Sequence, residues 1–76
     1  MKIKKNLETY LRCEIFYTKV GFESETDTWF KESILDAGIQ RCLGACQFAE
    51  LCGMDEKEVG RMYEKARAEL EALDEM

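Results

Sequence analysis

Three of the four cysteines in this chain fall within residues 40–53, QRCLGACQFAELCG, so metal and redox chemistry are weighed first. Cys42 and Cys46 are four residues apart, Cys52 follows six residues later, and Cys13 lies far upstream. Four thiolates can hold zinc, but zinc ribbons and knuckles use two close cysteine pairs on turns, often with histidine. This sequence has one such pair and no histidine.

Burial in a helix explains the cysteines better than chemistry does. The chain has no CxxC redox pair, and a disulfide between Cys42 and Cys46 within one helix would be strained. Reduced cysteine packs as a small hydrophobic residue. We therefore predict no metal and no cofactor, and keep Cys13, Cys42, Cys46 and Cys52 as the ligands of an alternative, metal-binding interpretation.

Other catalytic groups are missing from the sequence as well. It has no Ser/His/Asp set, no glycine-rich phosphate loop and no carboxylate pair at catalytic spacing. Without histidine, the usual general base at neutral pH is also missing. We expect a protein that is not an enzyme.

Arg41 is the unusual residue of the cysteine-rich stretch, because it falls inside an apolar arc of the predicted middle helix. Glu14 occupies the equivalent place on the predicted first helix. Burying either charge alone is costly, whereas two opposite charges satisfy each other. We predict a partly buried ion pair that fixes the helix register. Two alternatives stay open: Arg41 binds an anionic ligand group, or it extends to solvent without a partner.

The element that must position Arg41 is a helix over residues 27–51. Its wide apolar arc is typical of a central helix that packs on more than one side. Ser24, with Asp27 three residues on, is the expected N-terminal cap, and Gly53 suits the position after the last turn. One stripe of this helix carries small side chains that let a partner backbone approach closely: Gly38, Cys42, Ala45 and Ala49.

The clearest helix is the last, over residues 55–74. Apolar residues recur at helical spacing from Val59 onward. Asp55 and Glu58 predict a capping box at its start, and Met54 with Val59 predicts a hydrophobic staple.

The first element, over residues 6–20, is interpreted as a helix capped by Asn6. Its expected inner face holds Leu7, Tyr10, Leu11, Tyr17 and Thr18. Residues 10–20 are also rich in β-branched and aromatic residues, so a strand is the alternative, although no second strand is found to pair with it. Apolar residues go almost all the way round this helix. That is more than a three-helix monomer covers, and it predicts a homodimer or another protein partner.

Length and charge set the remaining limits. The chain has 76 residues, which predicts a single helical domain over residues 1–76, all-α with three helices. Its 16 acidic and 11 basic residues give a net charge of −5, which argues against direct nucleic-acid binding. No run is apolar enough for a signal peptide or a membrane span, so we expect a cytoplasmic protein without membrane contact.

Three aromatic residues are candidates for contact with a partner: Trp29, Phe30 and Tyr17. The alternative is that Trp29 and Phe30 cover the end of the core and that Tyr17 lies at the core edge with its hydroxyl in water. The favoured function is a small interaction or regulatory module. One alternative is a nucleic-acid-associated regulator using Lys2, Lys4 and Lys5, or an acidic mimic of nucleic acid. The other is the cysteine-based metal-binding protein.

The stretch DAGIQRCLGACQFAELCGMDEKEVGRMYEKARAEL, residues 36–70, resembles small uncharacterised helical proteins carried by phages and mobile elements of gut Gram-positive bacteria. The resemblance lies in the cadence of Arg41, Gly44 and Phe48, a short turn, then Val59 and Tyr63. It implies a non-enzymatic accessory or regulatory protein that acts on host machinery. It assigns no functional residue.

Overall fold

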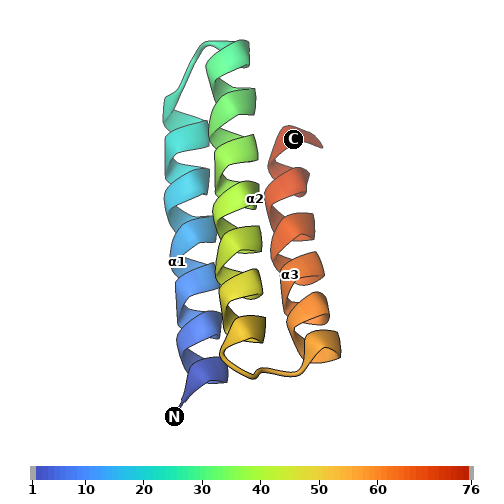
Figure 1. Ribbon diagram of the computed structural model, residues 1–76. Coiled ribbons are helices and arrows are strands. Elements are labelled where there is room, and N and C mark those ends of the chain that lie inside the picture. The colour runs from blue at the N-terminus through green and yellow to red at the C-terminus, as the bar shows by residue number, and fades with distance from the viewer. Residues whose placement is uncertain (1, 76) are drawn as a thin grey trace.

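The computed structural model describes residues 2–75 as three α-helices, of which the second runs antiparallel to the first and the third (Figure 1). They are α1 (Ile3–Ser24), α2 (Thr28–Leu51) and α3 (Glu56–Glu71), followed by a short 3-10 helix, η1 (Ala72–Glu75). The all-α prediction is confirmed. The described residues contain no strand, so the strand alternative for residues 10–20 is wrong.

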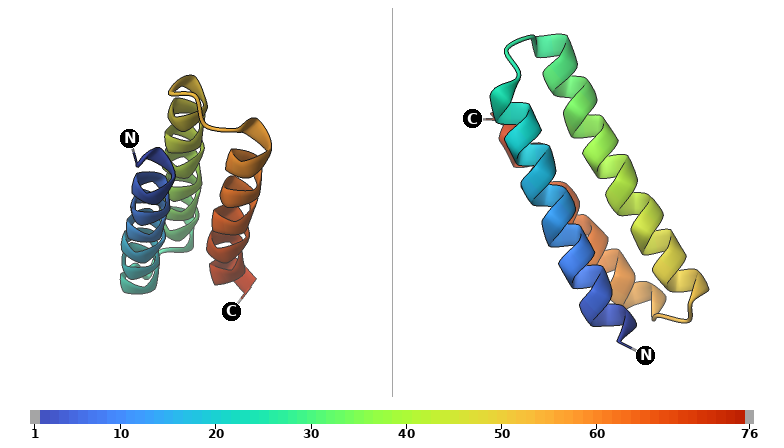
Figure 2. Two further views of the ribbon diagram at one scale, coloured as in Figure 1. Left: turned by 90° about the horizontal axis from the view of Figure 1, so that it is seen from below. Right: turned by 90° about the vertical axis from the view of Figure 1, so that its left-hand side faces the viewer.

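The long helices α1 and α2 lie side by side, and the shorter α3 packs on one side of this pair (Figure 2). Helix α2 contacts both of the others, as expected for the central helix. The core consists of 11 buried apolar side chains: Leu7, Leu11, Phe22, Leu35, Cys42, Cys46, Ala49, Val59, Ala66, Leu70 and Leu73.

The first helix is longer than the predicted 6–20, and Asn6 does not cap it. The amide of Asn6 already donates within the first turn, to the carbonyl of Lys2, and Lys2 occupies the cap position without a side-chain hydrogen bond. At the other end the helix continues to Ser24. This extension buries Phe22 in the core, which adds apolar contact that the shorter helix would lose.

The second helix begins as predicted, but with a different cap. Asp27, not Ser24, accepts hydrogen bonds from the amides of Trp29 (2.9 Å) and Phe30 (3.2 Å). Ser24 belongs to the last turn of α1, where its hydroxyl donates to the carbonyl of Val20. A serine inside a helix bonds the backbone one turn back, and so it is not free to cap the next helix.

The turn from α2 to α3 follows the local signals in the sequence. Gly53 has φ of +98°, the left-handed conformation that favours glycine after a helix. Asp55 accepts from the amide of Glu58 at 3.0 Å. The reverse half of the predicted capping box is replaced, because the Glu58 carboxylate pairs with Lys4 of α1 at 2.9 Å.

Helices α1 and α2 lie close together where Thr18 faces Gly38. A Cβ atom built on Gly38 would lie 2.7 Å from Thr18 Cγ2, which is shorter than real contacts allow. Thr18 is only 1% exposed, so it has no room to move away. The small-residue stripe predicted for α2 therefore contains a close contact to α1 at Gly38, and this contact helps to fix the register of the two helices.

Candidate interaction surface

Helix α1 carries uncharged residues on two faces. One face enters the core through Leu7, Leu11, Thr18 and Phe22. The other points to solvent and is called the α1 seam: Tyr10, Cys13, Tyr17 and Val20. The spacing of the seam, three, four and three residues, is that of a helix–helix packing stripe.

Tyr17 was predicted to lie on the inner face of α1, and this prediction is wrong. Its side chain is 67% exposed, and Tyr10 is 42% exposed. The inner arc is centred on Leu11 and Thr18, which share one line along the helix at about 100° per residue. Tyr17 stands about a quarter turn from that line, on the side away from α3.

Helix α2 has a matching exposed stripe, the α2 seam: Phe30, Ala37, Gly44, Phe48 and Leu51, with Arg41 on its border toward α1. Phe48 is 66% exposed and Leu51 is 86% exposed. A Cβ built on Gly44 would meet nothing within 4 Å. Large apolar side chains therefore stand at both ends of this seam, and small ones separate them.

The two seams lie on the same side of the bundle. Around α1, the contact to α2 is made by Glu14 and Thr18, and the contact to α3 is made by Leu11 and Ile15. Going round α1 from the side that faces α3, one meets first the side that faces α2 and then the α1 seam. Going round α2 in the same way, one meets first the side that faces α3, then the side that faces α1, where Arg41 lies, and then the α2 seam. Together the seams form one surface opposite α3, called the outer face.

Glu14 and Arg41 meet in the groove between the two seams. Arg41 Nε donates to Glu14 Oε2 at 2.5 Å, and a terminal nitrogen of Arg41 is 3.5 Å from the hydroxyl oxygen of Thr18. The Glu14 side chain is 16% exposed and that of Arg41 is 48% exposed. The structure therefore brings the two charges together, with the carboxylate enclosed and the guanidinium reaching the surface.

The enclosed carboxylate affects its neighbours. Burial, followed by the negative charges of Glu14 and Cys46, raises the pKa of Cys42 to about 11, and Arg41 opposes this shift. Burial and then Glu14 also raise the pKa of the Tyr10 hydroxyl. Both groups consequently stay protonated at neutral pH, and neither adds charge to the centre of the outer face.

Trp29 and Phe30 lie at the start of α2, beyond the reach of α3. Their rings pack edge to face with centroids 5.0 Å apart. Phe30 begins the α2 seam, whereas Trp29 points about 100° away from it around the helix. Of the three aromatic residues proposed for partner contact, Phe30 and Tyr17 thus belong to the outer face, and Trp29 stands at its edge.

The four cysteines do not come together. Cys42 and Cys46 are buried in the core, while Cys13 is exposed on the α1 seam and Cys52 is exposed at the end of α2. The burial of Cys42 and Cys46 agrees with the prediction that the cysteines pack inside a helix. That prediction is wrong for Cys13, which faces solvent, and for Cys52, which is the cap residue after the last turn of α2. Among residues 2–75, no group of three or more Cys, Asp, Glu or His side chains is arranged to hold a metal ion.

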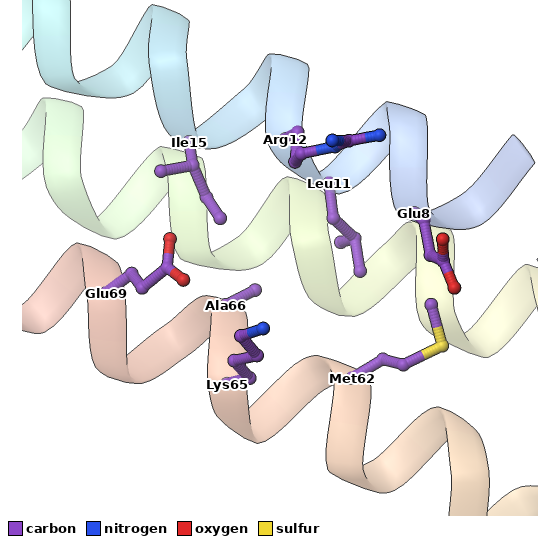
Figure 3. Close-up of a pocket in the computed structure, with 8 residues that line it drawn as sticks. All are labelled: Glu8, Leu11, Arg12, Ile15, Met62, Lys65, Ala66 and Glu69. Carbon is purple, nitrogen blue, oxygen red and sulfur yellow. The ribbon is translucent and has the colours of Figure 1, made fainter. Parts of the chain in front are cut away.

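An open groove of about 380 Å³ separates α1 from α3 (Figure 3). Leu11 and Ile15 point from α1 toward Ala66 of α3 and form its apolar floor. Two acidic and two basic side chains flank it: Glu8, Arg12, Lys65 and Glu69. Since these charges balance, the groove does not select an anion or a cation.

Charges are otherwise gathered away from the outer face. An open recess between α2 and η1 is lined by five carboxylates, those of Glu32, Asp36, Glu71, Asp74 and Glu75. At the N-terminus, Lys4 pairs with Glu58, and this contact raises the pKa of Lys4. Of the three lysines considered for nucleic-acid binding, Lys4 is thus engaged within the fold, which leaves Lys2 and Lys5 at that end.

Helix order and packing define the chain as an all-α three-helix bundle that exposes a second apolar face. No family model, no curated protein and no solved structure matches the chain. Within residues 2–75, no helix combines the length and the apolar character that crossing a membrane requires.

Proposed function

We propose that this protein is a small, non-enzymatic interaction or regulatory module that binds a helical protein surface through its outer face. One observation supports this proposal above all. The chain is 36% charged, yet the outer face, which extends along its two longest helices, carries only the charges of Glu14 and Arg41, which pair with each other. Large exposed apolar patches with polar surroundings mark protein contacts. The partner is a second copy, which would give a homodimer, or another protein.

Cytoplasmic location remains part of this proposal. All four cysteines are free thiols, which is the usual state in reducing compartments. The resemblance to accessory proteins of phages and mobile elements stays a prediction, and it suggests a bacterial host extract as the source of partners.

The test compares two chains that each gain one carboxylate at an exposed position. Tyr17→Glu places it in the centre of the outer face, and Ala68→Glu places it on the exposed side of α3. Both variants should fold, because neither site is buried. We expect tagged wild type and Ala68→Glu to retain the same partner from a Gram-positive bacterial extract, or the same self-association, and Tyr17→Glu to lose it. Equal behaviour of all three chains would refute the proposal.

A further inference from the structure

The outer face fits a second copy of this chain, an inference that rests on the proposed function. We infer that two chains pack their outer faces together around a two-fold axis parallel to the helices. Each α1 then lies against α2 of the other copy, and the four long helices form an antiparallel bundle with α3 outside. Another α1–α2 pair supplies a partner surface of the same length and width.

The exposed area supports an interface of ordinary size. At roughly 200 Å² for a whole aromatic side chain, the exposed parts of Tyr10, Tyr17, Phe30 and Phe48 come to about 450 Å². Val20 and Leu51 extend this area along both seams. The total approaches the roughly 800 Å² that each partner buries in a standard interface.

Charge distribution allows two copies of a chain with net charge −5 to meet. All 16 acidic residues lie within residues 2–75, and Glu14 alone among them contacts the outer face, where Arg41 neutralises it. The other acids of α1 and α2 lie at helix ends, toward α3 or on the outer edges. Two outer faces in contact therefore bring no unpaired like charges together, while the acidic surfaces stay in solvent.

The shapes of the two seams are also complementary when the copies are related in this way. The Glu14–Arg41 and Thr18–Gly38 contacts set the levels: Ala37 is the residue of the α2 seam nearest in height to Tyr17, and Gly44 is the one nearest to Tyr10, each within about two residues. A two-fold axis parallel to the helices puts each tyrosine opposite the small residue of the other copy. The rings of Tyr10 and Tyr17 thus pack against Gly44 and Ala37 of the second copy. The two-fold symmetry repeats these two contacts on the other side of the interface.

Gly44 provides the decisive substitution. A side chain there meets nothing within 4 Å in the single chain, and leucine forms helix better than glycine, so Gly44→Leu should fold. In the dimer it would collide with Tyr10 of the second copy at both related positions. We expect Gly44→Leu to raise the dimer dissociation constant by at least about tenfold, since overpacking of this kind is strongly unfavourable.

The matched control is Gly60→Leu on α3, where an added Cβ also meets nothing within 4 Å. Sedimentation equilibrium in reducing buffer, from micromolar to millimolar chain, should show dimers for wild type and Gly60→Leu and monomers for Gly44→Leu. Circular dichroism checks that all three chains are helical. If wild type stays monomeric, or if Gly44→Leu dimerises as well as wild type does, the inference is wrong. A monomer whose partner capture is still lost in Tyr17→Glu would leave the proposed function standing.

Disulfide formation tests the direction of the two-fold axis. Exposed Cys13 lies level with the stretch between Arg41 and Gly44, so it should face that part of α2 in the second copy. With Cys52→Ser as background, mild oxidation should link Gly44→Cys chains into covalent dimers and should not link Gly60→Cys chains. If the Cys52→Ser background alone forms covalent dimers through Cys13, then α1 packs on α1, and the proposed arrangement is wrong.

Discussion

Replacing Gly38 with alanine tests the helix contact on which the outer face depends. Two opposing effects determine the result. Alanine is favoured over glycine inside a helix by about 1 kcal/mol. Against this, the new methyl group would lie within 3 Å of three side-chain atoms of Thr18. Thr18 is buried and its backbone is held in α1, so it cannot move away from the methyl group. Overpacking of well-packed sites costs about 1–3 kcal/mol, and here the separation is shorter than any ordinary contact, so the upper end applies.

We therefore expect Gly38→Ala to lower the free energy of unfolding by about 2 kcal/mol, a large share of the stability of so small a domain. Urea denaturation at fixed chain concentration measures it. Gly60→Ala, where the methyl group meets nothing, should instead raise stability by up to about 1 kcal/mol. Thr18→Ala removes the two nearest atoms and should recover most of the loss in the double variant. A Gly38→Ala protein as stable as wild type would refute the close helix contact.

Three further predictions concern charge and capping. Arg41→Ala leaves the enclosed Glu14 carboxylate without its partner and should cost about 1 kcal/mol in urea unfolding, whereas Arg67→Ala, which breaks an exposed pair on α3, should cost no more than about 0.5 kcal/mol. Equal losses would show that the Glu14 pair is only a surface contact. Asp27→Ala removes the cap of α2 and should cost about 1 kcal/mol by the same measurement, and an unchanged midpoint would contradict it. The pKa of Cys42 is raised from 9.0 to about 11 on folding. The protonated thiol therefore stabilises the folded state fully below pH 9, and this stabilisation is lost as the pH rises to 11. Between these pH values the free energy of unfolding should fall by about 2 kcal/mol more in wild type than in Cys42→Ala.

Local chemistry made the turns predictable from the sequence. Gly53 and Asp55 act through backbone conformation and a hydrogen bond three residues away, so nothing distant can change their roles. The start of α1 was not predictable in this way. Asn6 has the side chain of a cap, but Ile3 packs against the core and Lys4 pairs with Glu58 of α3, and these contacts stabilise a helix that begins earlier and has no side-chain cap.

The contact between Glu14 and Arg41 could be predicted because each is a charged residue within an apolar arc of its helix. When two neighbouring helices pack their apolar arcs together, two such opposite charges can meet and pair. Tyr17 shows the limit of that reasoning. Helix α1 carries uncharged residues on two faces, and periodicity alone does not say which of them meets the core. Which face of α1 is buried depends on where α3 packs, and the sequence of α1 alone does not determine that.

The length and position of α3 separate two groups of exposed aromatic residues: Trp29, beyond the end of α3, and the aromatic residues of the outer face. At about 1.5 Å per residue, its 16 residues span about 24 Å, whereas the 24 residues of α2 span about 36 Å. Its C-terminal end and η1 share a recess with Glu32, Leu35 and Asp36, about one turn before Trp29. Trp29 therefore lies beyond the end of α3 and also points away from it, on the same line of α2 as the exposed Gln40 and Gln47, whereas Tyr17 and Phe48 lie on the outer face, which no helix of residues 2–75 covers. Substituting Trp29 should accordingly leave self-association intact, whereas a charge at Tyr17 or Phe48 should abolish it.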